Sequence, residues 1–140
     1  MSAPTKITIE ATVMAPAPRV WACWTEPAHI TRWNFASPDW QCPRASNELV
    51  VGGKYMARME AKDGSFGFDF EATYNEIVPQ ARLVYTMPDG RVVQTTFEAL
   101  GDATKVTTIF DAETQNAADM QRDGWQAILN NFKAHTEAAR

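Results

Sequence analysis

Residues 116–139 read NAADMQRDGWQAILNNFKAHTEAA and contain no proline. The large apolar side chains of this stretch recur at the spacing i, i+3, i+4 and i+7, which places them on one face of an α-helix: Trp125, Ile128, Leu129 and Phe132. A helix of about 20 residues is roughly 30 Å long. Asn116 is its expected N-cap. The rest of the chain must therefore supply the surface that covers this apolar face.

The strands that precede this helix predict an antiparallel sheet. The clearest strand is residues 66–74, where Phe66, Phe68 and Phe70 alternate with polar or small residues. We expect further strands at residues 7–13, 49–59, 83–87, 92–100 and 104–112, most of them joined by short turns that favour hairpins. Gly52 and Gly53 lie inside one of these strands and predict a bulge or a sharp bend there. The pattern indicates an α+β fold with a curved sheet of about six strands.

Two short helices are expected between the first strand and the remaining strands. Pro16 and Pro18 end the first strand, and Glu26-Pro27 begins the second helix. The segment 34–47 is expected to form an irregular loop. A chain of 140 residues predicts a single domain, with residues 1–5 as a loose tail.

Composition excludes several classes of function. The net charge is −4 and no basic stripe is present, so we expect no nucleic-acid partner. No apolar run reaches the length of a membrane span, and no signal-peptide segment is evident, which predicts a cytoplasmic protein without a membrane partner. The two cysteines, Cys23 and Cys42, have no metal-ligand spacing and are interpreted as reduced thiols. The five tryptophans exceed what a minimal core needs and leave room for a cavity.

A curved sheet around a helix encloses space, and this is where we expect a ligand site. The predicted wall and mouth of this cavity comprise Trp33, Trp40, Tyr55, Phe68, Phe70, Gln121, Trp125 and Leu129. Several of these roles stay open. Trp125 and Leu129 suit a packed core as well as a cavity wall, Trp33 and Trp40 suit either a lid or a hydrophobic plug, and Gln121 either lies at the edge of the apolar stripe or orients a ligand.

No residue pattern predicts catalysis, a metal or a cofactor. Asp69 and Glu71 share one face of a strand, but it is the polar face, which favours solvated carboxylates. His29 and His135 form no metal-binding motif with each other or with a cysteine. Cys23 has no base beside it in the sequence, although a distant histidine could reach it.

In the order of its short motifs, the chain resembles the START/Bet v 1-like (SRPBCC) superfamily, and within it the family of homologues of the activator of the 90-kDa heat-shock-protein ATPase. The motifs are Ala15-Pro16 to Val20-Trp21, Thr25-Glu26-Pro27 to Trp33, Val51-Gly52-Gly53-Lys54-Tyr55, Asp63-Gly64, Glu76-Ile77-Val78-Pro79 with Leu83-Val84, Thr104-Lys105-Val106-Thr107, and Gly124-Trp125 with Leu129. The resemblance implies a helix-grip fold, a hydrophobic cavity and, through the family's name, a chaperone partner and a role in stress. It implies no shared catalytic residue.

The leading hypothesis is therefore non-catalytic binding of an apolar or aromatic small molecule by a monomer or homodimer. One alternative is a co-chaperone or protein-interaction module, and another is an enzyme that acts on a polyketide-like substrate in the same cavity. The size of the cavity distinguishes them: a closed core below about 100 Å³ favours interaction, and several hundred Å³ favours a ligand. A polar trio converging inside it favours the enzyme.

Overall fold

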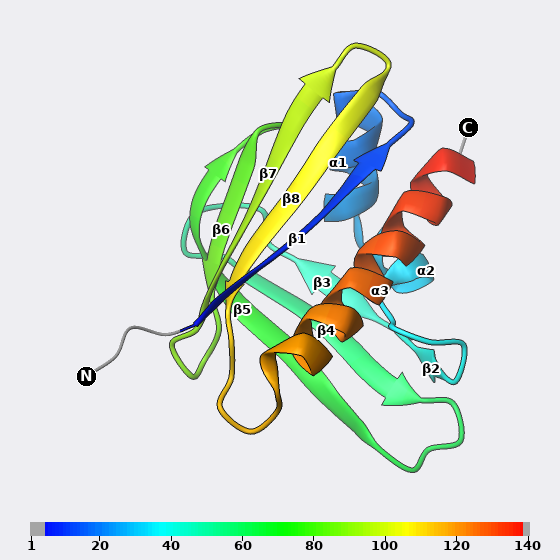
Figure 1. The fold of residues 1–140 in the computed structure, drawn as a ribbon, viewed down its shortest axis with the longest axis vertical. Helices are drawn as coiled ribbons and strands as arrows, with labels where there is room; N and C mark the ends of the chain where they lie inside the picture. Colours follow the sequence, from blue (N-terminus) through cyan, green and yellow to red (C-terminus); the bar gives the residue numbers. More distant parts are fainter. Residues whose placement is uncertain (1–4, 139–140) are drawn as a thin grey trace.

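The computed structural model describes residues 5–138 and shows a curved antiparallel sheet wrapped around one long helix, α3 (Ala118–Ala138) (Figure 1). This confirms the predicted helix-grip fold and the unbroken C-terminal helix. The expected loose tail falls largely on residues 1–4, which lie outside the described residues. Of that tail, Thr5 is described, and its carbonyl accepts a hydrogen bond from the Ala112 N–H at 2.8 Å.

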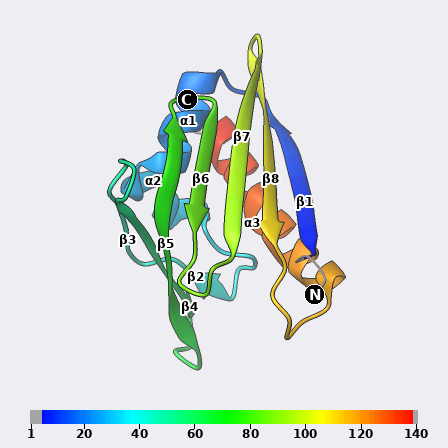
Figure 2. The same ribbon diagram turned by 90° about the vertical axis from the view of Figure 1, so that its left-hand side faces the viewer.

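Over residues 5–138 the sheet has eight strands, two more than expected, because the loop at 34–47 contributes two short ones. The strands are β1 (Lys6–Val13), β2 (Trp40–Gln41), β3 (Ala45–Asn47), β4 (Lys54–Ala61), β5 (Gly67–Val78), β6 (Arg82–Thr86), β7 (Val92–Leu100) and β8 (Ala103–Asp111). Their order is β1-β8-β7-β6-β5-β4-β2, with β3 also paired to β4. Figure 2 shows the sheet in front, with α3 and the short helices α1 (Ala17–Thr25) and α2 (Pro27–Trp33) behind it.

The glycine pair has a different role from the predicted one. Gly52 and Gly53 lie in a turn before β4, which begins at Lys54. Gly52 has φ +85°, and a Cβ on Gly53 would lie 2.2 Å from the Glu48 carbonyl oxygen, so the tight turn requires glycine at both positions. The bulge occurs instead in β5, where the pairing with β6 shifts between Tyr74 and Glu76.

The C-terminal half of α3 packs into the core between the sheet and the short helices. Leu129 and Phe132 are 2% and 0% exposed. The Phe132 ring lies edge-on to Trp24 and Trp33, with centroid distances of 4.8 and 5.0 Å. Thus α1 and α2 close one end of the space beneath the sheet. Within residues 5–138, no helix is long and apolar enough to cross a membrane.

Towards its N-terminal half, α3 runs beside β1, the edge strand of the sheet. The Gln126 side-chain amide donates to the Glu10 carbonyl of β1 at 3.1 Å. The Glu10 carbonyl lies on the outer edge of the sheet, where no other strand of residues 5–138 pairs with β1, and the Gln126 amide occupies it instead. The helix is therefore fixed at two places, the sheet edge and the core. The side chains that form the site lie between these two contacts.

Candidate ligand-binding site

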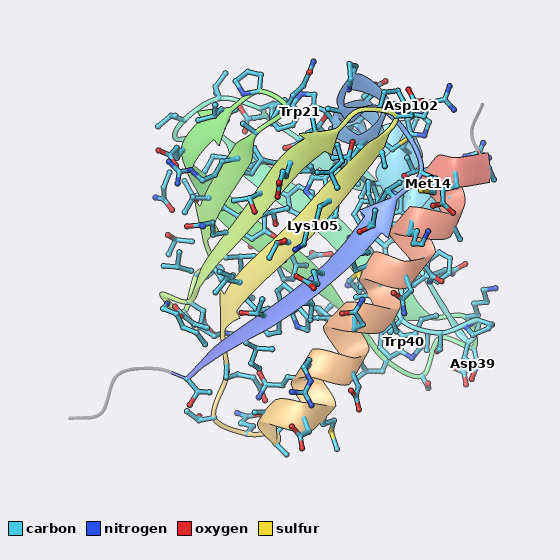
Figure 3. The ribbon with its side chains drawn as sticks, turned by 45° about the horizontal axis from the view of Figure 1, so that its top comes forward. Met14, Trp21, Asp39, Trp40, Asp102 and Lys105 are labelled. Carbon is cyan, nitrogen blue, oxygen red and sulfur yellow. The ribbon has the colours of Figure 1, made fainter. Side chains whose placement is uncertain are left out.

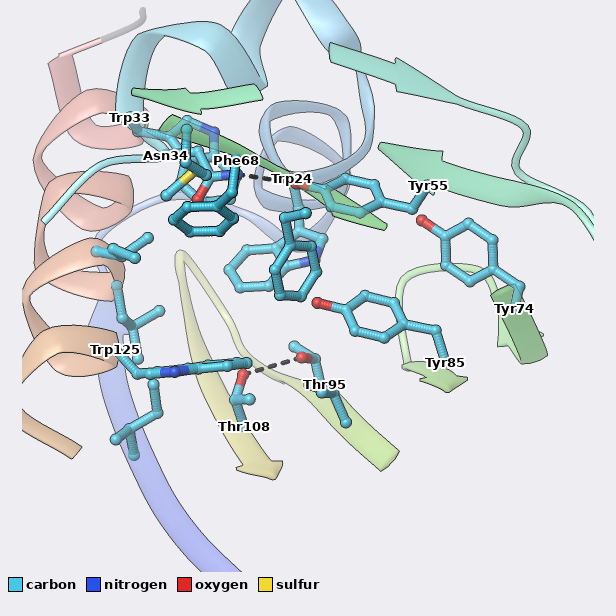
Figure 4. A pocket seen from close by; sticks show the side chains of 16 residues that line it. Trp24, Trp33, Asn34, Tyr55, Phe68, Tyr74, Tyr85, Thr95, Thr108 and Trp125 are labelled. Atoms are coloured by element: carbon cyan, nitrogen blue, oxygen red, sulfur yellow. Dashed lines mark hydrogen bonds between the residues drawn. The ribbon is translucent and has the colours of Figure 1, made fainter. Parts of the chain in front are cut away.

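A cavity of about 150 Å³ lies between the inner face of the sheet and the helices (Figure 4). Most of its wall consists of aromatic and aliphatic side chains, with a few polar ones. The strands contribute Ile9, Tyr55, Met59, Phe68, Phe70, Tyr74, Tyr85, Val93, Thr95 and Thr108, and the helices and the residue after α2 contribute Trp24, Trp33, Asn34, Trp125, Ile128 and Leu129. A cavity of this size accommodates roughly one aromatic ring.

Stacked rings explain why the space is not filled. Trp125 lies flat on Phe110, with ring centroids 3.9 Å apart and planes at 11°. Tyr55 and Tyr85 stack against each other at 5.8 Å on the opposite side. Phe70 approaches both groups edge-on, at 6.0 to 6.3 Å. Each ring is held by a neighbour, so none is free to collapse into the gap.

Most of the polar groups in the wall are already paired. The Asn34 side-chain amide donates to the Tyr55 hydroxyl at 3.0 Å, and the hydroxyls of Thr95 and Thr108 lie 2.9 Å apart. The Tyr85 hydroxyl and the indole N–H groups of Trp24 and Trp125 have no hydrogen-bond partner among residues 5–138. Figure 4 shows this hydroxyl pointing into the cavity towards the space between Trp24 and Trp125.

The cavity is electrically neutral. Burial raises the pKa of Tyr74 to about 12 and raises the pKa values of Tyr55 and Tyr85 well above the usual range, so all three phenols keep their protons. The described residues of the wall include no carboxylate, ammonium, guanidinium or imidazole. The cavity therefore suits an uncharged molecule, and the Tyr85 hydroxyl can donate to a hydrogen-bond acceptor on it.

The structure brings six of the eight predicted site residues to the cavity: Trp33, Tyr55, Phe68, Phe70, Trp125 and Leu129. Phe68 is 42% exposed, which places the mouth of the cavity at its end of β5. Trp33 is 3% exposed, donates from Nε1 to the Cys23 carbonyl at 2.9 Å and stacks on Trp24. Trp33 is thus a fixed wall residue at the closed end, rather than a lid.

Trp40 lies outside the cavity wall. Its ring contacts Phe66 and Phe68 on the outside of the mouth, with centroid distances of 6.0 and 6.4 Å. Figure 3 shows it next to Asp39, at the opposite end of the molecule from Trp21. Trp40 pairs through β2 with the end of β4, and this edge position turns its ring to the mouth rather than into the cavity.

Gln121 does not line the cavity, in contrast to its predicted role as a polar contact. Its amide group donates to the carbonyls of Glu113 and Asn116 at 3.1 and 2.8 Å and accepts from the Glu113 N–H at 2.9 Å. These bonds satisfy backbone groups in the loop before α3, which would otherwise need water. Asn116 belongs to the same loop and is not the N-cap, since the helix begins at Ala118.

Sequence reasoning missed several wall residues as ligand contacts, among them Asn34, Met59 and Tyr85. Tyr85 could have been identified from strand alternation, because Leu83 and Tyr85 share the inner face with the paired Val93. Asn34 follows the last turn of α2, and no periodic pattern reaches it.

The curved antiparallel sheet, the long C-terminal helix and the apolar cavity between them define the helix-grip class of the START/Bet v 1-like superfamily. The profile of the family described as Activator of Hsp90 ATPase homolog 1-like protein matches residues 14–137. The chain belongs to this family.

Solved structures of similar chains support the assignment. The AHSA1-like protein from Aeromonas hydrophila is 44% identical, with 96% of this chain and 94% of that chain covered and a TM-score of 0.90. Chr148 from Cytophaga hutchinsonii is 47% identical, with 95% and 92% covered and a TM-score of 0.82. CV1439 from Chromobacterium violaceum shares the fold at 22% identity, with 96% and 99% covered and a TM-score of 0.86. No curated protein matches the chain.

Proposed function

We propose that this protein binds a small, uncharged, planar molecule non-covalently in the cavity between the sheet and α3. The observation that carries the proposal is the Tyr85 hydroxyl, which faces an aromatic cavity and has no partner among the described residues. Tyr85 is half-buried, and a ligand that carries an acceptor group can take the hydrogen bond that its hydroxyl does not make within the protein.

The dimensions and wall of the cavity restrict the ligand. Its volume, about 150 Å³, is above the roughly 100 Å³ of a closed core and below the several hundred Å³ expected from the sequence for a ligand pocket, so it restricts a ligand to about one aromatic ring. Aromatic rings make up much of the wall, among them those of Trp125, Tyr85 and Phe70, and this favours a flat aromatic compound. The absence of charged groups among the described wall residues favours a neutral one.

The experiment compares three probes of similar size by isothermal titration: acetophenone, ethylbenzene and benzoate. We expect acetophenone to bind most tightly, because its carbonyl can accept from Tyr85, and benzoate to bind least, because its carboxylate would lose its hydration. In Tyr85→Phe, which removes the hydroxyl and keeps the ring, the preference for acetophenone over ethylbenzene should fall by about three- to tenfold.

Ile128→Phe supplies a control, because Ile128 is half-buried and lines the same cavity. The larger side chain should weaken both neutral probes together and leave their ratio unchanged. Equal binding of all three probes, or a preference that survives in Tyr85→Phe, would contradict the proposed mode of recognition.

The polar groups of the cavity bear on the enzyme alternative. Tyr55, Tyr74 and Tyr85 do gather on one side of the cavity, as a reactive trio would. Their raised pKa values keep them protonated, so they act as hydrogen-bond donors and not as bases at neutral pH. This arrangement supports orientation of a ligand rather than proton abstraction from it.

A second candidate function, binding to a chaperone of the kind in the family's name, is favoured by an aromatic surface at the mouth. Phe66 is 61% exposed and contacts Trp40 and Phe68, so three rings form one outward patch. Such patches often mark protein interfaces. Phe66→Ala should weaken binding to an Hsp90 ATPase at least tenfold, whereas Met120→Ala, a change at an exposed side chain elsewhere, should not.

A further inference from the structure

Three helices bring Cys23, His29 and His135 together at the end of the molecule where α1 and α2 meet the last turns of α3. Nδ1 of His29 and Nε2 of His135 lie 2.9 Å apart, although the two residues are 106 positions apart in the sequence. One ligand atom from each of the three residues lies within 4.8 Å of the other two. None of the three lines the aromatic cavity.

The thiol side of this cluster is shielded from solvent. Cys23 is 2% exposed, and both imidazoles are half-buried. At this distance one of the two imidazole nitrogens donates its N–H to the lone pair of the other, so the two facing nitrogens hold one proton between them. A thiol and two imidazoles form the mixed sulfur and nitrogen donor set that zinc prefers.

Thr136 gives a second, independent observation. Its side chain is 0% exposed, it follows His135 on α3, and its hydroxyl has no hydrogen-bond partner of regular geometry within the described chain. The hydroxyl lies beside the Cys23 thiol. A thiolate at Cys23 would accept a hydrogen bond from it, which is the kind of supporting contact that metal-bound sulfur receives.

We propose that Cys23, His29 and His135 form a binding site for one zinc ion, with water as the fourth ligand. Tetrahedral zinc bonds of about 2.0 to 2.3 Å set the donor atoms roughly 3.3 to 3.6 Å apart. The imidazole nitrogens must separate slightly and the sulfur must move inward, which are changes that side-chain rotation supplies. Binding releases one proton from the Cys23 thiol, and the proton shared by the imidazoles moves to an outward ring nitrogen.

The charges near the site are mixed. Arg19 and Glu26 act on Cys23, and Arg32 acts on His135. The Arg19 guanidinium favours the Cys23 thiolate, both guanidinium groups repel a dication, and Glu26 offsets part of this repulsion. We therefore expect the bonds to the three ligand atoms, and not the attraction of nearby negative charges, to hold the ion. The bound ion would link α1, α2 and α3.

The test uses Co²⁺, which replaces zinc and gives thiolate charge-transfer absorption in the near ultraviolet. The full-length protein, freed of metal with a chelator and reduced, is titrated with Co²⁺ and then with Zn²⁺. We expect one Co²⁺ per chain, with absorption that Zn²⁺ abolishes. The absorption should vanish in Cys23→Ser, and His29→Gln should weaken binding at least about tenfold.

Cys42→Ser is the matched control, because Cys42 is the only other thiol of the chain and is equally buried. It should bind Co²⁺ as the unchanged protein does. Circular dichroism establishes that each variant is folded, and His29→Gln, at a half-buried position, keeps the test valid should Cys23→Ser unfold. The proposal is overturned if the unchanged protein shows no such absorption. It is also overturned if folded Cys23→Ser keeps the absorption and Cys42→Ser loses it.

Discussion

Replacing Trp125 with alanine tests whether α3 is held to the sheet by the ring that also forms the cavity wall. The indole is half-buried and stacks on Phe110 at 3.9 Å. An indole that removes roughly 150 Å² from water contributes about 4 kcal/mol at 25 cal/mol per Å². The stacking contact with Phe110 adds to this stabilisation. The cavity already present beside the ring reduces the cost of truncation, because fewer atoms lose a contact when the indole is removed.

We therefore expect Trp125→Ala to lower the free energy of unfolding by about 3 to 5 kcal/mol. Urea unfolding followed by circular dichroism measures this change, with the m-value of the unchanged protein as a check that the transition stays two-state. Met120→Ala is the control, because Met120 lies on the same helix and is 64% exposed, and its effect should stay within about 0.5 kcal/mol. A loss below about 1 kcal/mol for Trp125→Ala would refute the reasoning.

Three further changes test other parts of the structure. Phe132→Ala should cost about 3 to 5 kcal/mol in urea unfolding, because this fully buried ring contacts two tryptophans. Thr95→Val and Thr108→Val should each cost about 1 to 3 kcal/mol by leaving one buried hydroxyl without a partner, and the double variant should cost less than their sum. Asp111 accepts hydrogen bonds from Lys6 and from the Val92 N–H, and both lower the pKa of its carboxyl group in the folded protein. The stability that this carboxylate contributes is therefore fully present above its unfolded pKa of about 4. That stability is lost as the pH falls through the lower folded pKa.

Each of these predictions has a control or a contrary outcome. Phe66→Ala, at a 61% exposed ring, should change stability by less than about 0.5 kcal/mol, and an effect equal to that of Phe132→Ala would mean that burial does not set the cost. Strict additivity of the two threonine changes would show that their hydroxyls do not interact. An acid unfolding profile that is the same in Asp111→Asn and the unchanged protein would contradict the assigned role of the carboxylate.

The elements of the fold could be predicted where one local pattern dominated. The apolar stripe around Trp125 and Phe132 predicted α3 within two residues of its observed start, and the alternation over residues 66–74 predicted most of β5. The turn at Gly52-Gly53 was assigned to the interior of a strand, because glycine signals both a bulge and a turn. The positive φ of Gly52, and the lack of room for a Cβ at Gly53 beside the Glu48 carbonyl, distinguish the two.

The site could be predicted only as far as faces could be assigned. Phe70, Trp125 and Leu129 reach the cavity because each points inward from a regular element. Gln121 was misplaced because its competing partners, the backbone groups of the loop after β8, are not evident from helical spacing. The cluster of Cys23, His29 and His135 was missed for the same reason, because its members lie on three helices and form no sequence motif.

The central claim, that the cavity takes a small neutral ligand, is tested most directly by the indole N–H signals in a ¹H–¹⁵N NMR titration with acetophenone. Of the five tryptophans, Trp24, Trp33 and Trp125 line the cavity, whereas Trp21 and Trp40 do not. We expect saturable shifts of the first three signals, with the other two unchanged. Unchanged signals throughout, or shifts confined to Trp40 at the surface aromatic patch, would contradict the claim.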